Sequence, residues 1–174
     1  MLQQIVTLLS DFGLRDVYVG VMKGVIAQIN PLLTVVDITH EIPPQDIVAG
    51  RFNLMNAYSY FPKGTVHVAV VDPGVGSDRR AIAVQLESGF LVEPDNGLLS
   101  GVLSQNPPVK VVELTNPEYW LAATPSQTFH GRDIFAPVGA HLASGVPIEK
   151  LGKIIDVGTL VQLQIPTPTQ TVRG

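Results

Sequence analysis

The chain is expected to fold as an α/β protein of three layers, in which helices flank both faces of a mostly parallel central sheet with some antiparallel strands. Three observations predict this. Short apolar runs rich in β-branched residues alternate with stretches whose apolar residues recur at helical spacing. Two of the runs are followed by an Asp and a Gly-containing turn, a pattern typical of strands that end beside a ligand crevice. The chain has 174 residues, 45% of them hydrophobic and 15% charged, which suits one compact domain.

The first half of the chain alternates strand and helix. The expected elements are a strand over residues 5–9, a helix from Asp16 to Ile29, a strand over 33–38, an amphipathic helix over 45–60 and a strand over 66–71. Asp16 is a suitable N-terminal cap, and Asn30-Pro31 stops the first helix. Helices of this length between strands imply right-handed crossovers and parallel pairing.

The segment from Val66 to Arg80 is the strongest candidate for a reaction centre. Its strand is almost entirely apolar, as in strands buried on both faces, and Asp72 follows at the carboxyl end. A Gly-rich turn leaves little bulk above Asp72, and Arg79 and Arg80 bring positive charge back. An Asp before Pro-Gly is also a common turn former, and arginines after a loop are usually solvated, so the local pattern leaves both interpretations open. Because side chains alternate along a strand, only one of the two arginines is expected to face the site.

The second half is expected to add an antiparallel part to the sheet. The expected elements are a hairpin of strands 81–86 and 90–93, a short helix over 98–103, a strand over 109–114, a helix from Phe129 to Ser144 closed by Gly145, and a last strand over 157–165. The α/β domain is thus expected to span residues 1–165. Residues 166–174, rich in Pro and Thr, have the composition of a linker.

Several polar residues fall at strand ends or in the turns after them, where a sheet gathers its functional side chains. Asp11 and Asp72 follow strands, and a carboxylate there can accept hydrogen bonds from a ribose diol. The alternative for Asp11 is a cap or a turn, while Asp95 and Asn96 have the pattern of turn residues. His130 precedes a helix and suits either a water-orienting role or a structural hydrogen bond.

The other histidines are weaker candidates. His67 lies inside a predicted strand and His141 inside a predicted helix, so both are expected to be structural, and His40 has a weaker case than His130. No metal site is expected, because a single His with scattered carboxylates is a poor ligand set.

Composition excludes several classes of protein. The formal net charge of −4 leaves no basic stripe for nucleic acid, and the absence of Cys excludes disulfides and thiolate metal sites. No apolar run is long enough to span a bilayer, and the N-terminus lacks the pattern of a secretory signal. We therefore expect a cytoplasmic protein that binds neither membrane nor nucleic acid.

Five stretches together resemble the S-adenosyl-L-methionine (SAM) hydroxide adenosyltransferases, also called SAM hydrolases, which are related to the SAM-dependent fluorinase and chlorinase. They are Thr7–Gly13 with Asp16–Gly24, Asp37–Ile42, Val70–Gly76 with Arg79-Arg80, Pro94–Gly97 and Phe129–Pro137. They occur in order across almost the whole chain.

The resemblance implies an enzyme in which water or hydroxide attacks the ribose C5′ of SAM and displaces L-methionine, giving adenosine. The family's catalytic triad corresponds to Asp72, Arg79 and His130, with Asp11 holding the ribose hydroxyls and Asn96 lining the same pocket. SAM is then the substrate, and no cofactor or metal is implied. An anionic Asp72 would repel a halide, which favours the hydrolase branch over the halogenating one.

The resemblance also implies a second domain. Similar proteins continue into a small C-terminal β-barrel that supplies adenine and methionine contacts from a neighbouring subunit of a homotrimer. Residues 166–174 would be the linker to that domain, which is absent from this sequence, and the substrate site would be incomplete without it.

Two other functions remain open from the residues alone. One is a non-catalytic nucleoside-binding or assembly module that uses Asp11 and the strand-end loops to hold a ligand without turnover. The other is a metal-dependent phosphohydrolase built on Asp11 and Asp72, whose activity a chelator would abolish.

Overall fold

The computed structural model describes residues 4–166, and within this range the chain forms one seven-stranded sheet. The strand order is β2-β1-β3-β5-β4-β6-β7, with the first four strands parallel and the last three antiparallel to their neighbours. The strands are β1 (Ile5–Ser10), β2 (Thr34–Thr39), β3 (Thr65–Val70), β4 (Ala81–Gln85), β5 (Gly89–Pro94), β6 (Lys110–Glu113) and β7 (Lys153–Ile154). The predicted parallel centre and the predicted hairpin are both confirmed.

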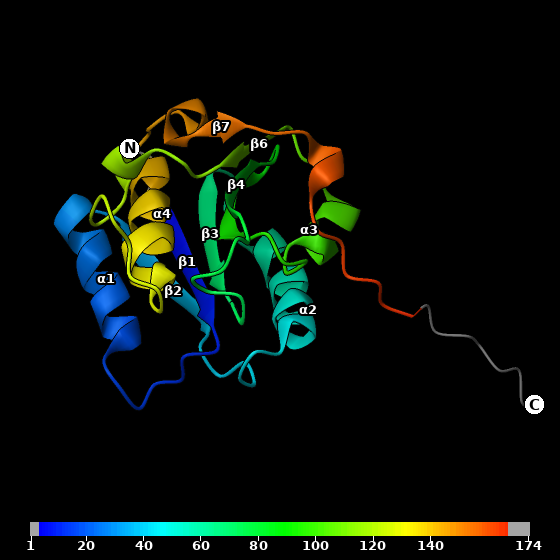
Figure 1. Ribbon diagram of the computed structural model, residues 1–174, viewed down its shortest axis with the longest axis horizontal. Helices are drawn as coiled ribbons and strands as arrows, with labels where there is room; N and C mark the ends of the chain where they lie inside the picture. The colour runs from blue at the N-terminus through cyan, green and yellow to red at the C-terminus, as the bar shows by residue number, and fades with distance from the viewer. Residues whose placement is uncertain (1–3, 167–174) are drawn as a thin grey trace, which may run out of the picture.

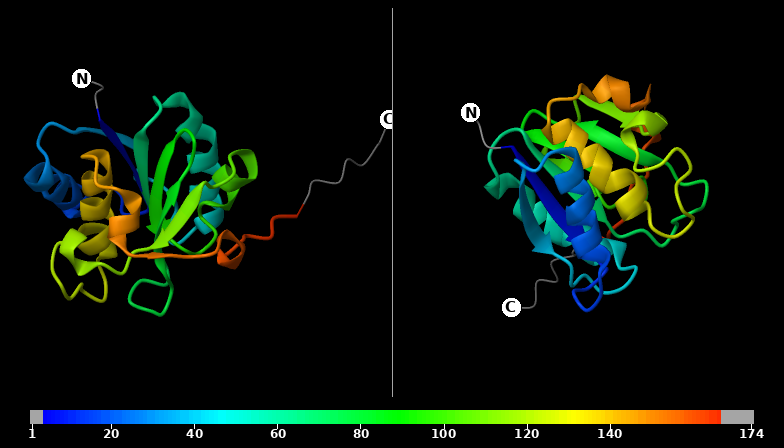
Figure 2. Two further views of the ribbon diagram at one scale, coloured as in Figure 1. Left: turned by 90° about the horizontal axis from the view of Figure 1, so that it is seen from above. Right: turned by 90° about the vertical axis from the view of Figure 1, so that its left-hand side faces the viewer.

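Helices cover both faces of the sheet, which confirms the three layers. They are α1 (Tyr18–Ile29), α2 (Ile47–Ala57), α3 (Ser100–Gln105) and α4 (Ala136–Ala143). Helices α1 and α4 pack together on one face and α2 and α3 on the other, as Figures 1 and 2 show. None of the helices in residues 4–166 combines the length and the apolar character needed to cross a bilayer.

The core lies in two layers, one on each side of β3, because every residue of this strand is buried. Val66 and Val68 face α4, whereas Ala69 packs with the residues of α2 and α3. Helix α4 approaches the sheet closely at Gly139, where an added Cβ would lie 2.5 Å from Cγ2 of Val68. Burial of these aliphatic side chains stabilises the central strands and so fixes the loops that follow them.

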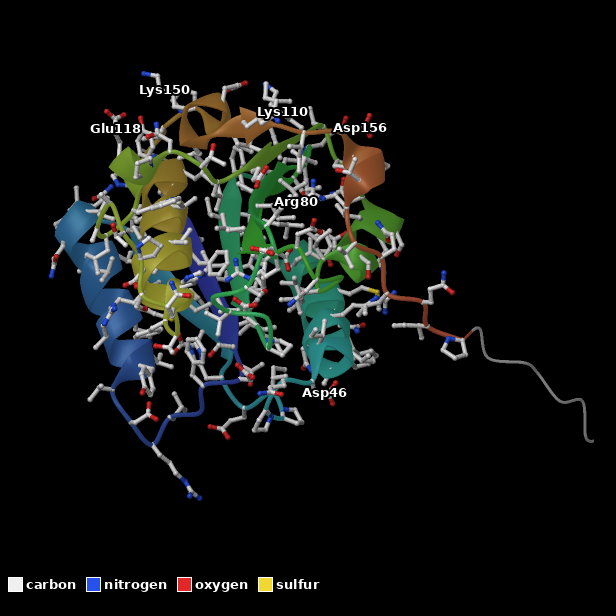
Figure 3. All side chains as sticks on the ribbon, in the orientation of Figure 1. Asp46, Arg80, Lys110, Glu118, Lys150 and Asp156 are labelled. Carbon is white, nitrogen blue, oxygen red and sulfur yellow. The ribbon has the colours of Figure 1, made fainter. Side chains whose placement is uncertain are left out.

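Two predicted elements differ from the structure. The predicted strand over 157–165 is wrong: a 3₁₀ turn (Val157–Thr159) stands there, and β7 is the last strand of the described residues. The reason is that side chains, not a neighbouring strand, bind this backbone, since Arg80 donates to the Thr159 carbonyl and Asp95 accepts from the Val161 amide. Figure 3 shows Arg80 and Asp156 near this segment.

The start of α1 also differs, because Val17 is the N-cap and the Asp16 carboxylate accepts only from the Tyr18 amide. Most of the predicted linker, residues 167–174, lies outside the described residues.

Glu93 is a fully buried carboxyl on β5, and neither of its oxygens has a hydrogen-bond partner within residues 4–166. Burial first, and the charge of nearby Asp95 second, raise the pKa of Glu93 well above its ordinary value of 4.5. The folded protein therefore favours the protonated, neutral form of this side chain.

Replacing Glu93 with Gln is expected to stabilise the protein increasingly as the pH rises. Above pH 4.5 an unfolded chain releases the Glu93 proton while the folded chain holds it. The wild-type free energy of unfolding therefore falls with rising pH, up to the folded pKa, by as much as about 1.4 kcal/mol per pH unit. The Gln side chain does not titrate, so the free energy of unfolding of the variant does not fall for this reason. Urea unfolding of both proteins from about pH 5 to 7 measures the difference, and a difference independent of pH would contradict this account.

Candidate active site

The candidate site is a cavity of about 270 Å³ at the carboxyl ends of β1 and β3. Figure 1 shows the loops after these two strands at the same end of the sheet as the loop that precedes α4. In Figure 3 Asp46, which follows the cavity residue Gln45, lies at the end of the molecule opposite Lys110 and Lys150. The lining residues are Asp11, Phe12, Pro44, Gln45, Val70, Asp72, Val75, Thr128, His130 and Gly131. The cavity thus combines two carboxylates and an imidazole with an apolar wall.

Asp72, Arg79 and His130 form one hydrogen-bonded group at this cavity. Arg79 Nε donates to both carboxylate oxygens of Asp72, at 2.9 and 3.0 Å, and Arg79 Nη2 also bonds Asp72 Oδ2. The same Nη2 lies 2.7 Å from His130 Nδ1. The side chains of Asp72 and Arg79 are only 5% and 11% exposed, and the guanidinium also lies over the ring of Phe135. A bidentate pair with so little exposure holds both groups in a fixed geometry.

These contacts determine the tautomer of His130. Arg79 has only donors, so His130 Nδ1 accepts, and Nε2 then carries the proton that is donated to the Ser126 carbonyl at 2.8 Å. Burial, and then the charge of Arg79, lower the pKa of His130 below 6.5, which favours this neutral form. Because both ring nitrogens of His130 are hydrogen-bonded, this side chain holds Arg79 in position. The Asp72 carboxylate, in contrast, has further lone pairs that can accept hydrogen bonds from a ligand.

The helix that carries His130 begins irregularly. The predicted helix from Phe129 starts with a π-helical turn, Gly131–Phe135, before α4. A π-turn adds a residue to the helical repeat and is frequent at functional sites. The space at Gly131 is tight, because a Cβ at this position would lie 3.1 Å from the ring of Phe12 and 3.2 Å from Met22 Sδ. His130 and Gly131 both line the cavity at this irregular helix start.

Asp11 lies in the cavity wall together with Asp72, as the strand-end pattern predicts. Its Oδ2 accepts from the backbone amide of Gln45 at 2.7 Å. Gln45 is the one described residue other than Gly with a positive φ, 64°, a strained conformation that aims its amide at Asp11. Sequence reasoning missed Gln45, and only the Pro43-Pro44 pair before it signalled a constrained loop. Asp11 Oδ1 has no hydrogen-bond partner within residues 4–166, so it is available to a ligand.

The two arginines after the central strand have different partners. Arg79 binds Asp72 and His130. Arg80 instead pairs with Asp95, through Nε at 3.0 Å and Nη2 at 2.6 Å, and donates to the Thr159 carbonyl. Asn96 is not among the residues that line the cavity. Its amide donates to the Val71 carbonyl at 2.8 Å, which braces the end of β3 beside Asp72.

The other histidines lie away from the cavity lining. His67 is buried and paired with Thr7 Oγ1, and burial lowers its pKa to about 4. His141 packs edge-on against Tyr119. His40 is buried and bonds Ser10. These contacts support the structural interpretation of His67 and His141.

No group of three or more His, Asp or Glu side chains in the described range is placed to hold a metal ion. The phosphohydrolase alternative would have to rely on Asp11 and Asp72, the two carboxylates that line the cavity, together with oxygens of the substrate. Addition of a chelator to an active preparation remains its direct test.

The sequence of the chain is similar to the sequences of several known proteins. The model of the SAM hydroxide adenosyltransferase N-terminal domain matches residues 6–152. The chain is 49% identical over 160 residues to an (R)-S-adenosyl-L-methionine hydrolase of Salinispora arenicola, covering 91% of this chain and 60% of that protein. A fluorinase of Actinoplanes sp. is more distant, with 28% identity over 98% of this chain and 64% of its own.

The fold is shared with a solved structure. The crystal structure of an uncharacterized conserved protein from Thermotoga maritima matches with a TM-score of 0.90 and 41% identity, covering 94% of this chain and 62% of that one. The chain spans about 60% of the length of the first curated relatives it matches.

Proposed function

The chain belongs to the SAM hydroxide adenosyltransferase family, and we propose that it carries the water-handling half of a site that hydrolyses SAM to adenosine and L-methionine. One observation carries this proposal. Asp72 and His130 line the same cavity as Asp11, and Arg79, which is not itself a lining residue, joins them into a single hydrogen-bonded group. The relatives named as SAM hydrolases support the same reaction.

The proposed reaction is an in-line displacement at the ribose C5′. The oxygen of one water forms a bond to C5′ while the C5′–S bond breaks and its electron pair passes to sulfur, which leaves as neutral L-methionine. The water loses one proton to Asp72, which returns it to solvent. Because the sulfonium is already a good leaving group, the protein mainly has to orient one water and exclude others.

Each residue of the group has a distinct role in this proposal. Asp72 accepts a hydrogen bond and then the proton from the attacking water. Arg79 stabilises negative charge on that oxygen and fixes Asp72. His130, with Nε2 tied to Ser126 and Nδ1 to Arg79, positions Arg79 without itself taking the proton. Asp11 accepts hydrogen bonds from the ribose hydroxyls through its unpaired Oδ1.

We also propose that the remaining contacts to SAM come from a C-terminal domain and a neighbouring subunit in a homotrimer. The cavity of about 270 Å³ supports this, because it lies just below the range of roughly 300–1,000 Å³ that ligand pockets occupy.

Chromatographic detection of adenosine and methionine after incubation with SAM tests the proposal. The assay compares this chain, a chimaera that continues with the C-terminal part of the Salinispora arenicola relative, and the Asp72→Ala variants of both. Asp72-dependent adenosine from the chimaera is the expected result. If neither form makes Asp72-dependent adenosine but calorimetry detects adenosine binding, the non-catalytic nucleoside-binding module becomes the better account.

A further inference from the structure

A chain of hydrogen bonds runs behind the cavity from the surface to the turn that carries Asp11. Lys23 Nζ donates to Asp37 Oδ2 at 2.6 Å, and Asp37 Oδ1 lies 3.1 Å from His40 Nε2. His40 Nδ1 lies 2.6 Å from Ser10 Oγ, which in turn accepts from the Phe12 amide at 3.2 Å. Ser10 is fully buried and His40 is 2% exposed, so water has almost no access to their contact.

The donors and acceptors along this chain are compatible with one another. Asp37 can only accept when ionised, so His40 Nε2 carries a proton. Ser10 Oγ accepts from the Phe12 amide, and with a neutral His40 ring it donates its own proton to His40 Nδ1. Burial alone would raise the pKa of Asp37, but hydrogen bonds from Lys23 and His40 outweigh it and lower that pKa, which keeps the acceptor ionised.

His40 holds the turn at both of its ends. Its imidazole bonds Ser10, and its backbone carbonyl accepts from the Gly13 amide at 2.8 Å. The two residues between these points, Asp11 and Phe12, both line the cavity. His40 therefore fixes the tetrapeptide that presents one carboxylate and one aromatic ring to the ligand, without touching the cavity itself.

We propose that His40 and Ser10 are positioning residues that hold the Asp11 carboxylate in place for the ribose diol. This inference rests on the proposed function, because it takes the ribose of SAM or adenosine as the ligand of Asp11. A positioned carboxylate favours a ribose over its dideoxy analogue, whereas a mobile one loses that preference, since a charged hydrogen bond depends on fixed geometry.

The test measures by calorimetry the affinity for adenosine and for 2′,3′-dideoxyadenosine, using this chain and the chimaera that supplies the C-terminal part of the site. We expect a preference for adenosine of about tenfold or more in the wild type, and its loss in Asp11→Asn, Ser10→Ala and His40→Gln. His40→Asn is expected to retain most of the preference, because its amide oxygen stands near the position of Nδ1 and can accept from Ser10. The Gln amide stands near Nε2 and cannot replace that acceptor.

The chain offers a matched control on the same strand. Thr7 Oγ1 bonds His67 Nδ1 at 2.8 Å, and both residues are buried, but neither lines the cavity. Thr7→Val thus removes an equivalent hydroxyl–imidazole bond from β1. We expect the nucleoside preference to survive in Thr7→Val, which separates positioning from a general loss of stability.

Amide hydrogen exchange gives a second reading that needs no ligand. In Ser10→Ala and His40→Gln the Phe12 and Gly13 amides should exchange at least about tenfold faster, while those of α4 should not change. Unchanged exchange would overturn the positioning role, and so would faster exchange with an intact preference. If the wild type has no preference, or Asp11→Asn leaves it intact, the proposed function fails instead, and the exchange rates alone decide the role of His40.

Discussion

Replacing Asp72 with Asn is expected to slow adenosine formation from SAM by about two to four orders of magnitude at saturating substrate. The amide has nearly the shape of the carboxylate, but it cannot take the proton of the attacking water. It also leaves Arg79 without the anion that now binds it through Nε and Nη2. Single-turnover measurement on the active form of the protein, the chimaera if this chain alone is inactive, gives the rate of the chemical step.

Asp95→Asn is the matched control for this variant. Asp95 is also buried and also paired with an arginine, Arg80, but that pair anchors the segment around Thr159 and does not line the cavity. We expect Asp95→Asn to lower stability while the folded fraction keeps the wild-type rate. A rate for Asp72→Asn within about tenfold of the wild type, or an equal loss in both variants, would contradict the assignment of Asp72.

Arg79→Ala and Arg80→Ala are expected to separate chemistry from stability. Removal of Arg79 takes away a donor that stabilises the attacking oxygen, which costs about two to three orders of magnitude in rate. It also leaves Asp72, whose side chain is 5% exposed, without a cation, and losing one partner of a buried pair costs roughly 3–5 kcal/mol. Arg80→Ala should keep the rate of the folded protein.

The Arg79 variant has a further consequence at His130. The charge of Arg79 is one of the two causes that lower the pKa of His130, so its removal should let that pKa rise towards 6.5. An NMR titration of the His130 imidazole in both arginine variants measures this. Loss of turnover in Arg80→Ala alone, with the His130 pKa unmoved in Arg79→Ala, would reverse the roles of the two arginines.

The sheet could be predicted because its strands are short apolar runs whose burial does not depend on details of the loops. A strand over residues 66–71 was predicted because nearly all of these residues are apolar. The structure has β3 (Thr65–Val70) there, and it is buried throughout. The segment after 157 could not be predicted in this way. It has apolar residues at strand-like spacing, but its backbone is bound by Arg80 and Asp95, which lie far away in the sequence.

The sequence predicted that Asp11 and Asp72 lie close together, because the ends of their strands meet at one edge of the sheet. The choice between Arg79 and Arg80 needed the structure, because alternation says that only one faces the site but not which one. Gln45 was missed because its contribution is a backbone amide in a strained conformation, which no side-chain pattern encodes.

In the proposed reaction, a water molecule held by Asp72 attacks the ribose C5′ of SAM. The most direct measurement runs the reaction in water labelled with heavy oxygen and locates the label by mass spectrometry of both products. We expect one labelled oxygen in adenosine, none in methionine, and formation of labelled adenosine at least about a hundredfold slower with Asp72→Asn. Label in methionine, or adenosine that forms without label, would contradict attack of water at C5′.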